Sequence, residues 1–111
     1  MNMNKETQEK IQELQIFEQN IQSLVIQKQA FQMELSETEN AISEVGKSKD
    51  EVYKITGSIM LKTDRSEVEK ELKEKKDILS LRLKSIEKQE LSIREKLDKL
   101  REEVVKGMKQ Q

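Results

Sequence analysis

Two long segments with seven-residue apolar spacing flank one short stretch that favours β-structure, and this arrangement constrains the fold most. The patterned segments cover residues ~5–46 and ~66–108, and the stretch between them, residues ~51–63, contains Val52-Tyr53-Lys54-Ile55-Thr56-Gly57-Ser58-Ile59-Met60-Leu61-Lys62. Two arms of nearly equal length, joined by a hairpin, can fold back on each other. We therefore predict a mainly α fold, a long antiparallel two-helix coiled coil joined by one β-hairpin, as a single domain over residues 1–111.

The first segment has an apolar seam that continues through five heptads. Most of its seam positions are apolar, which is typical of a coiled coil. We expect Gly46 to end this helix in a left-handed conformation and residues 46–50 to form a linker. The a positions are Leu14, Ile21, Lys28, Leu35 and Ile42, and the d positions are Phe17, Leu24, Phe31, Thr38 and Val45.

The second segment has a wholly apolar d row, Leu72, Leu79, Ile86, Ile93 and Leu100, and a mixed a row, Glu69, Lys76, Leu83, Glu90, Leu97 and Val104. A capping box, Asp64 with Glu67 or Ser66 with Glu69, would begin this helix. Antiparallel pairing places Lys28 among Leu83 and Ile86, and Glu90 among Ile21 and Leu24. Polar residues in a seam either fix its register or extend to solvent, and the sequence leaves both interpretations open.

The stretch between the helices is expected to be a hairpin with Gly57-Ser58 as its two-residue turn. Thr56 then lies opposite Ile59, and Ile55 opposite Met60. An isolated hairpin is marginally stable and has two unpaired edges. We therefore expect its apolar residues to join hairpins of other chains in a larger sheet or barrel. One face carries Tyr53, Ile55 and Met60, and the other carries Val52, Ile59 and Leu61.

Composition argues against several classes of function. The chain has no cysteine and no histidine, so disulfides, thiol chemistry and histidine-based catalysis are excluded. We find no catalytic constellation, phosphate loop or Ca²⁺ loop, and we expect neither an enzyme nor a cofactor or metal. Basic and acidic residues number 21 and 22, a balance that disfavours nucleic-acid binding. Without a signal peptide or an apolar span, no membrane association and a cytoplasmic location are expected.

The order helix, single hairpin and helix, in 111 residues, resembles the beta-type subunit of prefoldin in its archaeal form. The hairpin with its flanks, Glu51 to Thr63, is the most specific part of this resemblance. The Gln-rich first helix with Val25-Ile26-Gln27-Lys28-Gln29 fits as well. So do Glu71-Leu72-Lys73-Glu74-Lys75, Leu79-Ser80-Leu81-Arg82 and Glu87-Lys88-Gln89-Glu90 in the second helix. The resemblance covers nearly the whole chain.

The resemblance implies an ATP-independent chaperone, a hexamer of two alpha-type and four beta-type subunits. The hairpins would form intersubunit β-barrels. Unfolded proteins would be held at the free ends of the coiled coils and passed to a group II chaperonin. The chain's end at Gln110-Gln111 would leave out the client-binding tail of longer relatives.

Apolar residues gather at the free ends of the two predicted helices, where a holdase would bind its clients. The ends of a coiled coil fray, and Met3 and Met108 are flexible groups that suit promiscuous surfaces. For Leu14, Phe17, Leu97 and Leu100, plain seam packing is the better explanation. For Ile11, Ile16 and Val105, which lie off the seam, chance exposure explains the pattern about as well as client contact does. The predicted client-binding residues are Ile11, Leu14, Ile16, Phe17, Leu97, Leu100, Val104, Val105 and Met108.

Two other functions compete with this interpretation. The chain could be a structural coiled-coil adaptor or scaffold in which the hairpin is a mere linker. Such a linker would be polar, whereas this one is rich in apolar residues. A nucleic-acid-associated helical hairpin is the third possibility, and the charge balance disfavours it.

Overall fold

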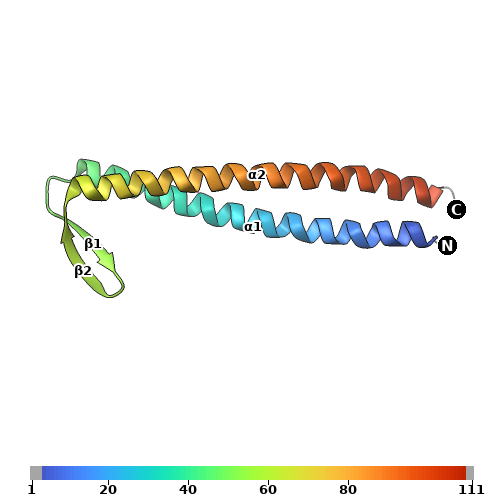
Figure 1. The fold of residues 1–111 in the computed structure, drawn as a ribbon, viewed down its shortest axis with the longest axis horizontal. Helices are drawn as coiled ribbons and strands as arrows, with labels where there is room; N and C mark the ends of the chain where they lie inside the picture. The colour runs from blue at the N-terminus through green and yellow to red at the C-terminus, as the bar shows by residue number, and fades with distance from the viewer. Residues whose placement is uncertain (1–3, 110–111) are drawn as a thin grey trace. The chain divides into compact units, whose positions relative to one another are not determined.

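The computed structural model describes residues 4–109, so Met3 lies outside the described residues. Helix α1 (Lys5–Lys47) is followed by strands β1 (Val52–Thr56) and β2 (Ile59–Thr63) and by helix α2 (Arg65–Lys109) (Figure 1). This order confirms the prediction of two long helices joined by one antiparallel hairpin. The chain forms two compact units, which we describe separately. The first unit combines the part of α1 up to Gln29 with the part of α2 from Ser85 onward. The second unit is Ala30–Lys84, which contains the hairpin.

The first turn of α1 has a side-chain cap that the sequence analysis did not identify. The Oδ1 atom of Asn4 accepts a hydrogen bond from the backbone N–H of Thr7 at 2.8 Å. Asparagine is among the preferred N-cap residues because its side chain satisfies an N–H that has no partner within the helix. This cap fixes the start of α1 at Lys5.

The prediction that Gly46 ends α1 in a left-handed conformation is wrong. The helix continues to Lys47, and the backbone N–H of Ser48 donates to the carbonyl of Glu44 at 3.0 Å. Among residues 4–109, Gly57 alone has a positive φ. The linker is therefore shorter than predicted and contains residues 48–51.

Helix α2 begins at Arg65, directly after Asp64. The Asp64 carbonyl accepts the backbone N–H of Val68 at 3.1 Å, and its carboxylate accepts the hydroxyl of Ser66 at 3.0 Å. An acidic residue at this position interacts favourably with the positive end of the helix dipole. The aspartate therefore marks the junction between β2 and α2.

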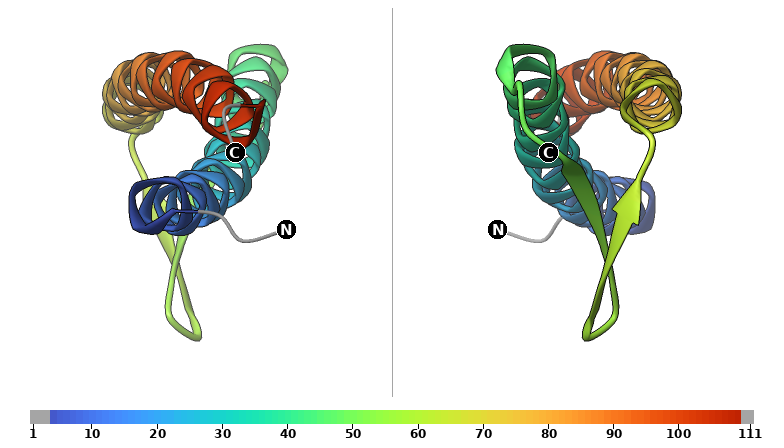
Figure 2. Two further views of the ribbon diagram at one scale, coloured as in Figure 1. Left: turned by 90° about the vertical axis from the view of Figure 1, so that its right-hand side faces the viewer. Right: turned by 90° about the vertical axis from the view of Figure 1, so that its left-hand side faces the viewer.

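The hairpin lies in the unit Ala30–Lys84 and has the register that the sequence predicts. Ile55 pairs with Met60, and Thr56 pairs with Ile59. Gly57 has a φ of 62°, and Ser58 has no positive φ, which indicates a type II′ turn. Figure 2 shows that the two strands twist about each other.

The seam predicted for the helices is the side that each helix buries within its unit. All ten seam positions of α1 are buried or half-buried, and of the eleven in α2 only Lys76 is exposed. Burying one aliphatic side chain of this kind contributes about 1.5–3 kcal/mol, so the seam is the main source of stability. The fully buried apolar residues are Ile21, Leu24, Leu79, Leu83, Ile86, Leu97, Leu100 and Val104.

Candidate assembly hairpin and client-binding tip

The hairpin exposes apolar side chains on both of its faces. Ile55, at 70% exposure, and Met60, at 64%, lie on one face, and Ile59, at 59%, lies on the other. Large apolar residues gathered on a short two-stranded element are unusual for a surface that stays in water. Of the six residues predicted for assembly, Val52 alone is half-buried, and the exposed ones are Tyr53, Ile55, Ile59, Met60 and Leu61.

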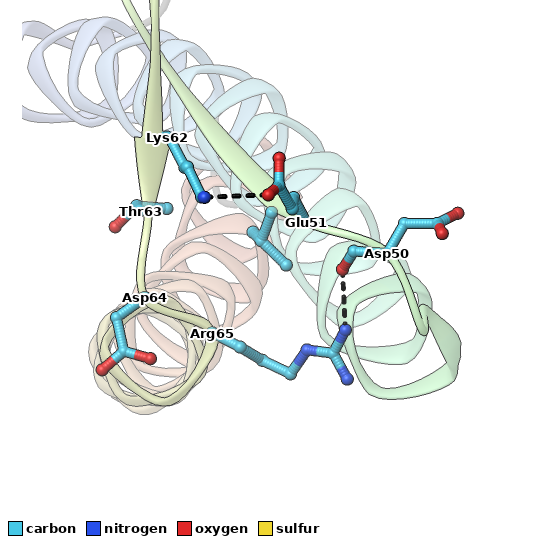
Figure 3. Close-up of a pocket in the computed structure, with 7 residues that line it drawn as sticks. Asp50, Glu51, Lys62, Thr63, Asp64 and Arg65 are labelled. Atoms are coloured by element: carbon cyan, nitrogen blue, oxygen red, sulfur yellow. Dashed lines mark hydrogen bonds and ion pairs between the residues drawn. The ribbon is translucent and has the colours of Figure 1, made fainter.

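A small polar network fixes the base of the hairpin (Figure 3). The Arg65 guanidinium donates to the carbonyl of Asp50 at 2.9 Å, which ties the start of α2 to the linker before β1. The Glu51 carboxylate pairs with Lys62 at 2.8 Å and accepts the hydroxyl of Tyr53, also at 2.8 Å. The Lys62 ammonium, with help from Tyr53, lowers the pKa of Glu51, while donation to this carboxylate raises the pKa of Tyr53.

A second contact connects the hairpin to the first turns of α2. The Lys54 ammonium lies 3.1 Å from the Glu71 carboxylate. Beside this ion pair is a small, mainly apolar hollow that Tyr53, Val68 and Leu72 help to line. These contacts orient the hairpin relative to α2, so the exposed side chains are presented in a defined direction.

The ends of α1 and α2 formed by residues 4–18 and 97–109, which we call the tip, contain all the predicted client-binding residues. The structure divides these residues into three groups by burial. Leu97, Leu100 and Val104 are buried in the seam, and Ile11, Leu14 and Phe17 are half-buried. The exposed group is Ile16, Val105 and Met108. Their role in client binding stays a prediction.

Two residues that the sequence analysis did not single out close the seam at the tip. Thr7 is buried, and its side chain lies against Gly107 of α2. A sequence signal existed, because Thr7 lies one heptad before Leu14 and Gly107 one heptad after Leu100. Neither residue is a large apolar one, so a search for apolar heptads passes over both.

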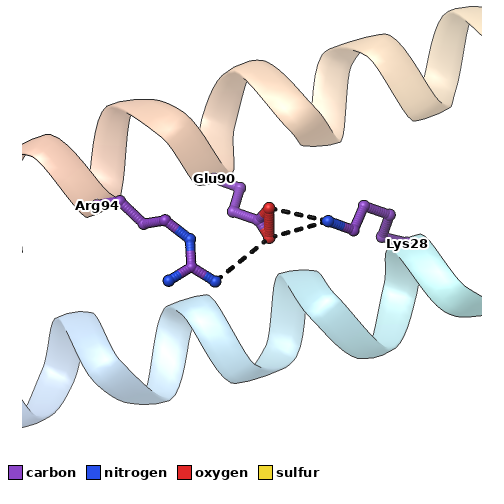
Figure 4. A network of polar contacts seen from close by, with 3 residues as sticks. All are labelled: Lys28, Glu90 and Arg94. Carbon is purple, nitrogen blue, oxygen red and sulfur yellow. Dashed lines mark hydrogen bonds and ion pairs between the residues drawn. The ribbon is translucent and has the colours of Figure 1, made fainter.

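The polar seam residues Lys28 and Glu90 bind each other (Figure 4). The Lys28 ammonium lies 2.9 and 3.3 Å from the two Glu90 carboxylate oxygens, and Arg94 approaches the second oxygen at 3.7 Å. The Glu90 side chain is only 12% exposed. The hydrogen bond from Lys28 is the largest cause of a lowered pKa at Glu90, and the charge of Arg94 contributes. The two side chains pair within the seam, so extension to solvent, one of the two interpretations left open above, is not what the structure shows.

The described residues offer neither a carboxylate cluster for a metal ion nor an apolar span. Across residues 4–109, acidic side chains do not gather in groups of three that could hold a metal ion. In the same range, neither helix has an apolar stretch that could cross a membrane.

The fold and its surfaces define a class, the single-hairpin coiled-coil proteins with an apolar hairpin. A family model described as "Prefoldin subunit" matches residues 8–111. The chain is 37% identical over 107 residues to prefoldin subunit beta of Methanothrix thermoacetophila, a match that covers 95% of this chain and 89% of the relative. It is 34% identical to the corresponding subunit of Thermococcus onnurineus, over 93% and 90% of the two chains. The chain belongs to the prefoldin subunit family.

Solved structures agree with this assignment. The crystal structure of the prefoldin beta subunit from Thermococcus strain KS-1 matches with a TM-score of 0.86 and 34% identity, over 93% of this chain and 92% of that one. The prefoldin beta2 subunit from the same strain matches in fold, with a TM-score of 0.70 and 17% identity over 78% and 95% of the chains. The resemblance to a beta-type subunit, inferred from the hairpin and its flanking helices, is thereby confirmed.

Proposed function

We propose that this prefoldin subunit is part of an ATP-independent holdase of the cytoplasm. It binds unfolded proteins at the tip and passes them to a group II chaperonin. It acts as one single-hairpin unit within a hexamer of two alpha-type and four beta-type subunits. The hairpins of these subunits form intersubunit β-barrels.

The exposure of the hairpin is the observation that carries this proposal. Ile59 and Leu61 lie on one face, Ile55 and Met60 on the other, and all four are more than half exposed. Burial removes apolar surface from water and is favourable by about 25 cal/mol per Å². Pairing with further strands would also satisfy the backbone groups at the two edges.

The tip supports the holdase part of the proposal. A holdase needs apolar surface that binds non-native chains without a catalytic group, and Val105, Met108 and Ile16 supply such surface. Arg101, Lys106 and Lys109 surround Val105 in a shallow, mainly apolar hollow. Flexible methionine and the aliphatic stems of long cations adapt to many sequences.

A direct test combines the purified chain with an alpha-type prefoldin subunit. The expected results are one hexameric species and suppressed aggregation of citrate synthase diluted from guanidinium chloride, without ATP. Separate species and no suppression would contradict both parts of the proposal.

The adaptor or scaffold hypothesis makes a different prediction for the hairpin. A mere linker would be indifferent to charge on its faces, so it would tolerate aspartate at Ile59 and Leu61. The apolar character of both faces favours the holdase subunit, and this substitution separates the two functions.

A further inference from the structure

The last seam layer at the tip consists of two small residues, Thr7 of α1 and Gly107 of α2. Each lies one heptad beyond the large apolar residues of its helix, Leu14 and Leu100. Thr7 is only 3% exposed, although it lies in the first turn of α1. Helix ends are the parts of a coiled coil that open most easily, whereas this end is packed.

A residue with a Cβ atom at position 107 would collide with the side chain of Thr7. A Cβ on Gly107 would lie 2.6 Å from Oγ1 of Thr7, and 3.6 and 3.7 Å from its Cγ2 and Cβ. Separations below 3.0 Å essentially never occur for real Cβ atoms. Glycine weakens a helix relative to alanine, so close approach is the structural reason for a glycine in α2.

Polar contacts hold the same two helix ends in place. Asn4 caps α1 by accepting the N–H of Thr7 at 2.8 Å. One turn further along, the Lys10 ammonium lies 3.6 Å from Glu103 of α2 and 3.4 Å from Glu6 of α1. The cap orders the turn that carries Thr7, and the ion pair joins the helices beside it.

We propose that the Thr7–Gly107 contact is a clamp that holds the tip closed and limits a client's access to the buried seam. Leu97, Leu100 and Val104 are at most 7% exposed in the closed tip, whereas Val105 is 49% and Met108 44% exposed. A client therefore contacts Val105 and Met108 first, and it reaches the buried residues Leu97, Leu100 and Val104 only when the clamp opens. A client that binds the open form better shifts the equilibrium towards it. This inference rests on the proposed holdase function.

Three substitutions separate the clamp from general effects on the helices. Gly107→Ala adds the Cβ that collides with Oγ1 of Thr7 and should force the ends apart. Thr7→Ala removes Oγ1 and Cγ2, so in the double variant Thr7→Ala/Gly107→Ala the two Cβ atoms meet at an ordinary 3.7 Å. Gly46→Ala is the matched control, because it makes the same change within α1 where a Cβ meets nothing within 4 Å.

The opening is measured by distances between spin labels on the full chain. The sequence has no cysteine, so cysteines placed at the exposed residues Glu9 and Glu102 carry the labels. Gly107→Ala should raise the open-to-closed ratio by about fivefold or more, as the lower end of overpacking effects predicts. Thr7→Ala removes the two Thr7 atoms nearest Gly107, so it should also open the tip, though less than Gly107→Ala does. The double variant, in which the two Cβ atoms are in contact again, and Gly46→Ala should keep the distance distribution of the unsubstituted chain.

Client holding is measured in parallel on unlabelled chains combined with an alpha-type prefoldin subunit, with citrate synthase diluted from guanidinium chloride. Gly107→Ala should hold more client than the unsubstituted chain, and Thr7→Ala/Gly107→Ala should return holding to the starting level. An unchanged distance distribution in Gly107→Ala would overturn the clamp. If Gly107→Ala opened the tip but held no more client, the claim that the clamp limits access to the seam would be overturned. The proposed holdase function would still be supported if the unsubstituted chain suppressed aggregation of citrate synthase. If the unsubstituted chain held no client, the proposed function would fail and the limit on access with it.

Discussion

At the scale of single residues, Lys28, Glu90 and Arg94 form the most specific interaction in the seam. A polar layer among apolar ones contributes less to the stability of the coiled coil than leucine packing does. It nevertheless destabilises any other register of the two helices, because such a register would separate the charges. From the sequence, each residue was placed among apolar neighbours of the other helix and not opposite its partner. The heptad alignment places Lys28 and Glu90 at different points along the seam. Their long side chains extend along the seam and meet, and an alignment of Cα positions does not take side-chain length into account.

The pair gives stability a defined pH dependence. In the folded chain the pKa of Glu90 lies below its ordinary value of 4.5. Its contribution is therefore present above that value and is lost as pH falls through the folded pKa. Glu90→Gln should lower the thermal unfolding midpoint near neutral pH, and the difference from the unsubstituted chain should shrink between about pH 5 and about pH 3.

Glu87→Gln is the control for this pH series, because Glu87 is exposed on the same helix. Its unfolding midpoint should stay close to that of the unsubstituted chain near neutral pH. A Glu90→Gln difference that stayed constant down to pH ~3 would show that the carboxylate's charge is not what stabilises the seam.

The helical geometry of Gly46 leads to a second prediction at this scale. Alanine fits the position, since a Cβ there would meet nothing within 4 Å. Gly46→Ala should raise the free energy of unfolding by about 0.5–1 kcal/mol, measured by urea titration. Gly57→Ala should instead weaken the hairpin, because a φ of 62° costs an L-residue about 1–2 kcal/mol. A destabilising Gly46→Ala would mean that this glycine is needed in a non-helical conformation.

At the scale of elements, the sequence was enough to predict both helices, the strands and the hairpin register. Heptad spacing and the Gly57-Ser58 turn are both local signals: the first is the recurrence of apolar side chains at the helical period, and the second is set by turn geometry. The end of α1 was missed because glycine can either end a helix in a left-handed conformation or take a helical conformation itself, as Gly46 does before the helix ends at Lys47. The Thr7–Gly107 layer was missed because close packing of small residues depends on how the two helices approach each other.

The hairpin is the element that the assembly proposal depends on. Ile59→Asp with Leu61→Asp places two charges on one apolar face and should abolish assembly with an alpha-type subunit, because burying unpaired charge is costly. Light scattering after size exclusion measures the assembly, and circular dichroism should show nearly unchanged helix content. Ser58→Asp, in the exposed turn, is the control and should assemble normally. A normal hexamer from the doubly substituted chain would argue against the barrel.

At the scale of the whole molecule, the hairpin that we propose for assembly lies in the unit Ala30–Lys84, and the tip that we propose for client binding belongs to the other unit. The two functions should therefore be separable by substitution. Val105→Asp with Met108→Asp removes apolar surface that is already exposed, so stability should change by less than about 0.5 kcal/mol. Client holding should fall clearly in the aggregation assay, while the hexamer should form as before.

Leu91→Asp supplies the matched control for the tip, since Leu91 is also exposed on α2, at 60%, but lies outside the tip. It should hold clients as well as the unsubstituted chain does. Equal losses from both variants would mean that clients bind along α2 in general. Loss of the hexamer on substituting Val105 and Met108 would assign these residues to assembly.

The mass of the complex with an alpha-type subunit, measured by native mass spectrometry, tests the central claim most directly. The hexamer proposed for this subunit, joined through the exposed apolar hairpin, predicts one dominant species with two alpha-type and four beta-type chains. Free subunits, or a complex that the aspartate substitutions at Ile59 and Leu61 leave unchanged, would contradict the claim that this hairpin is the assembly element.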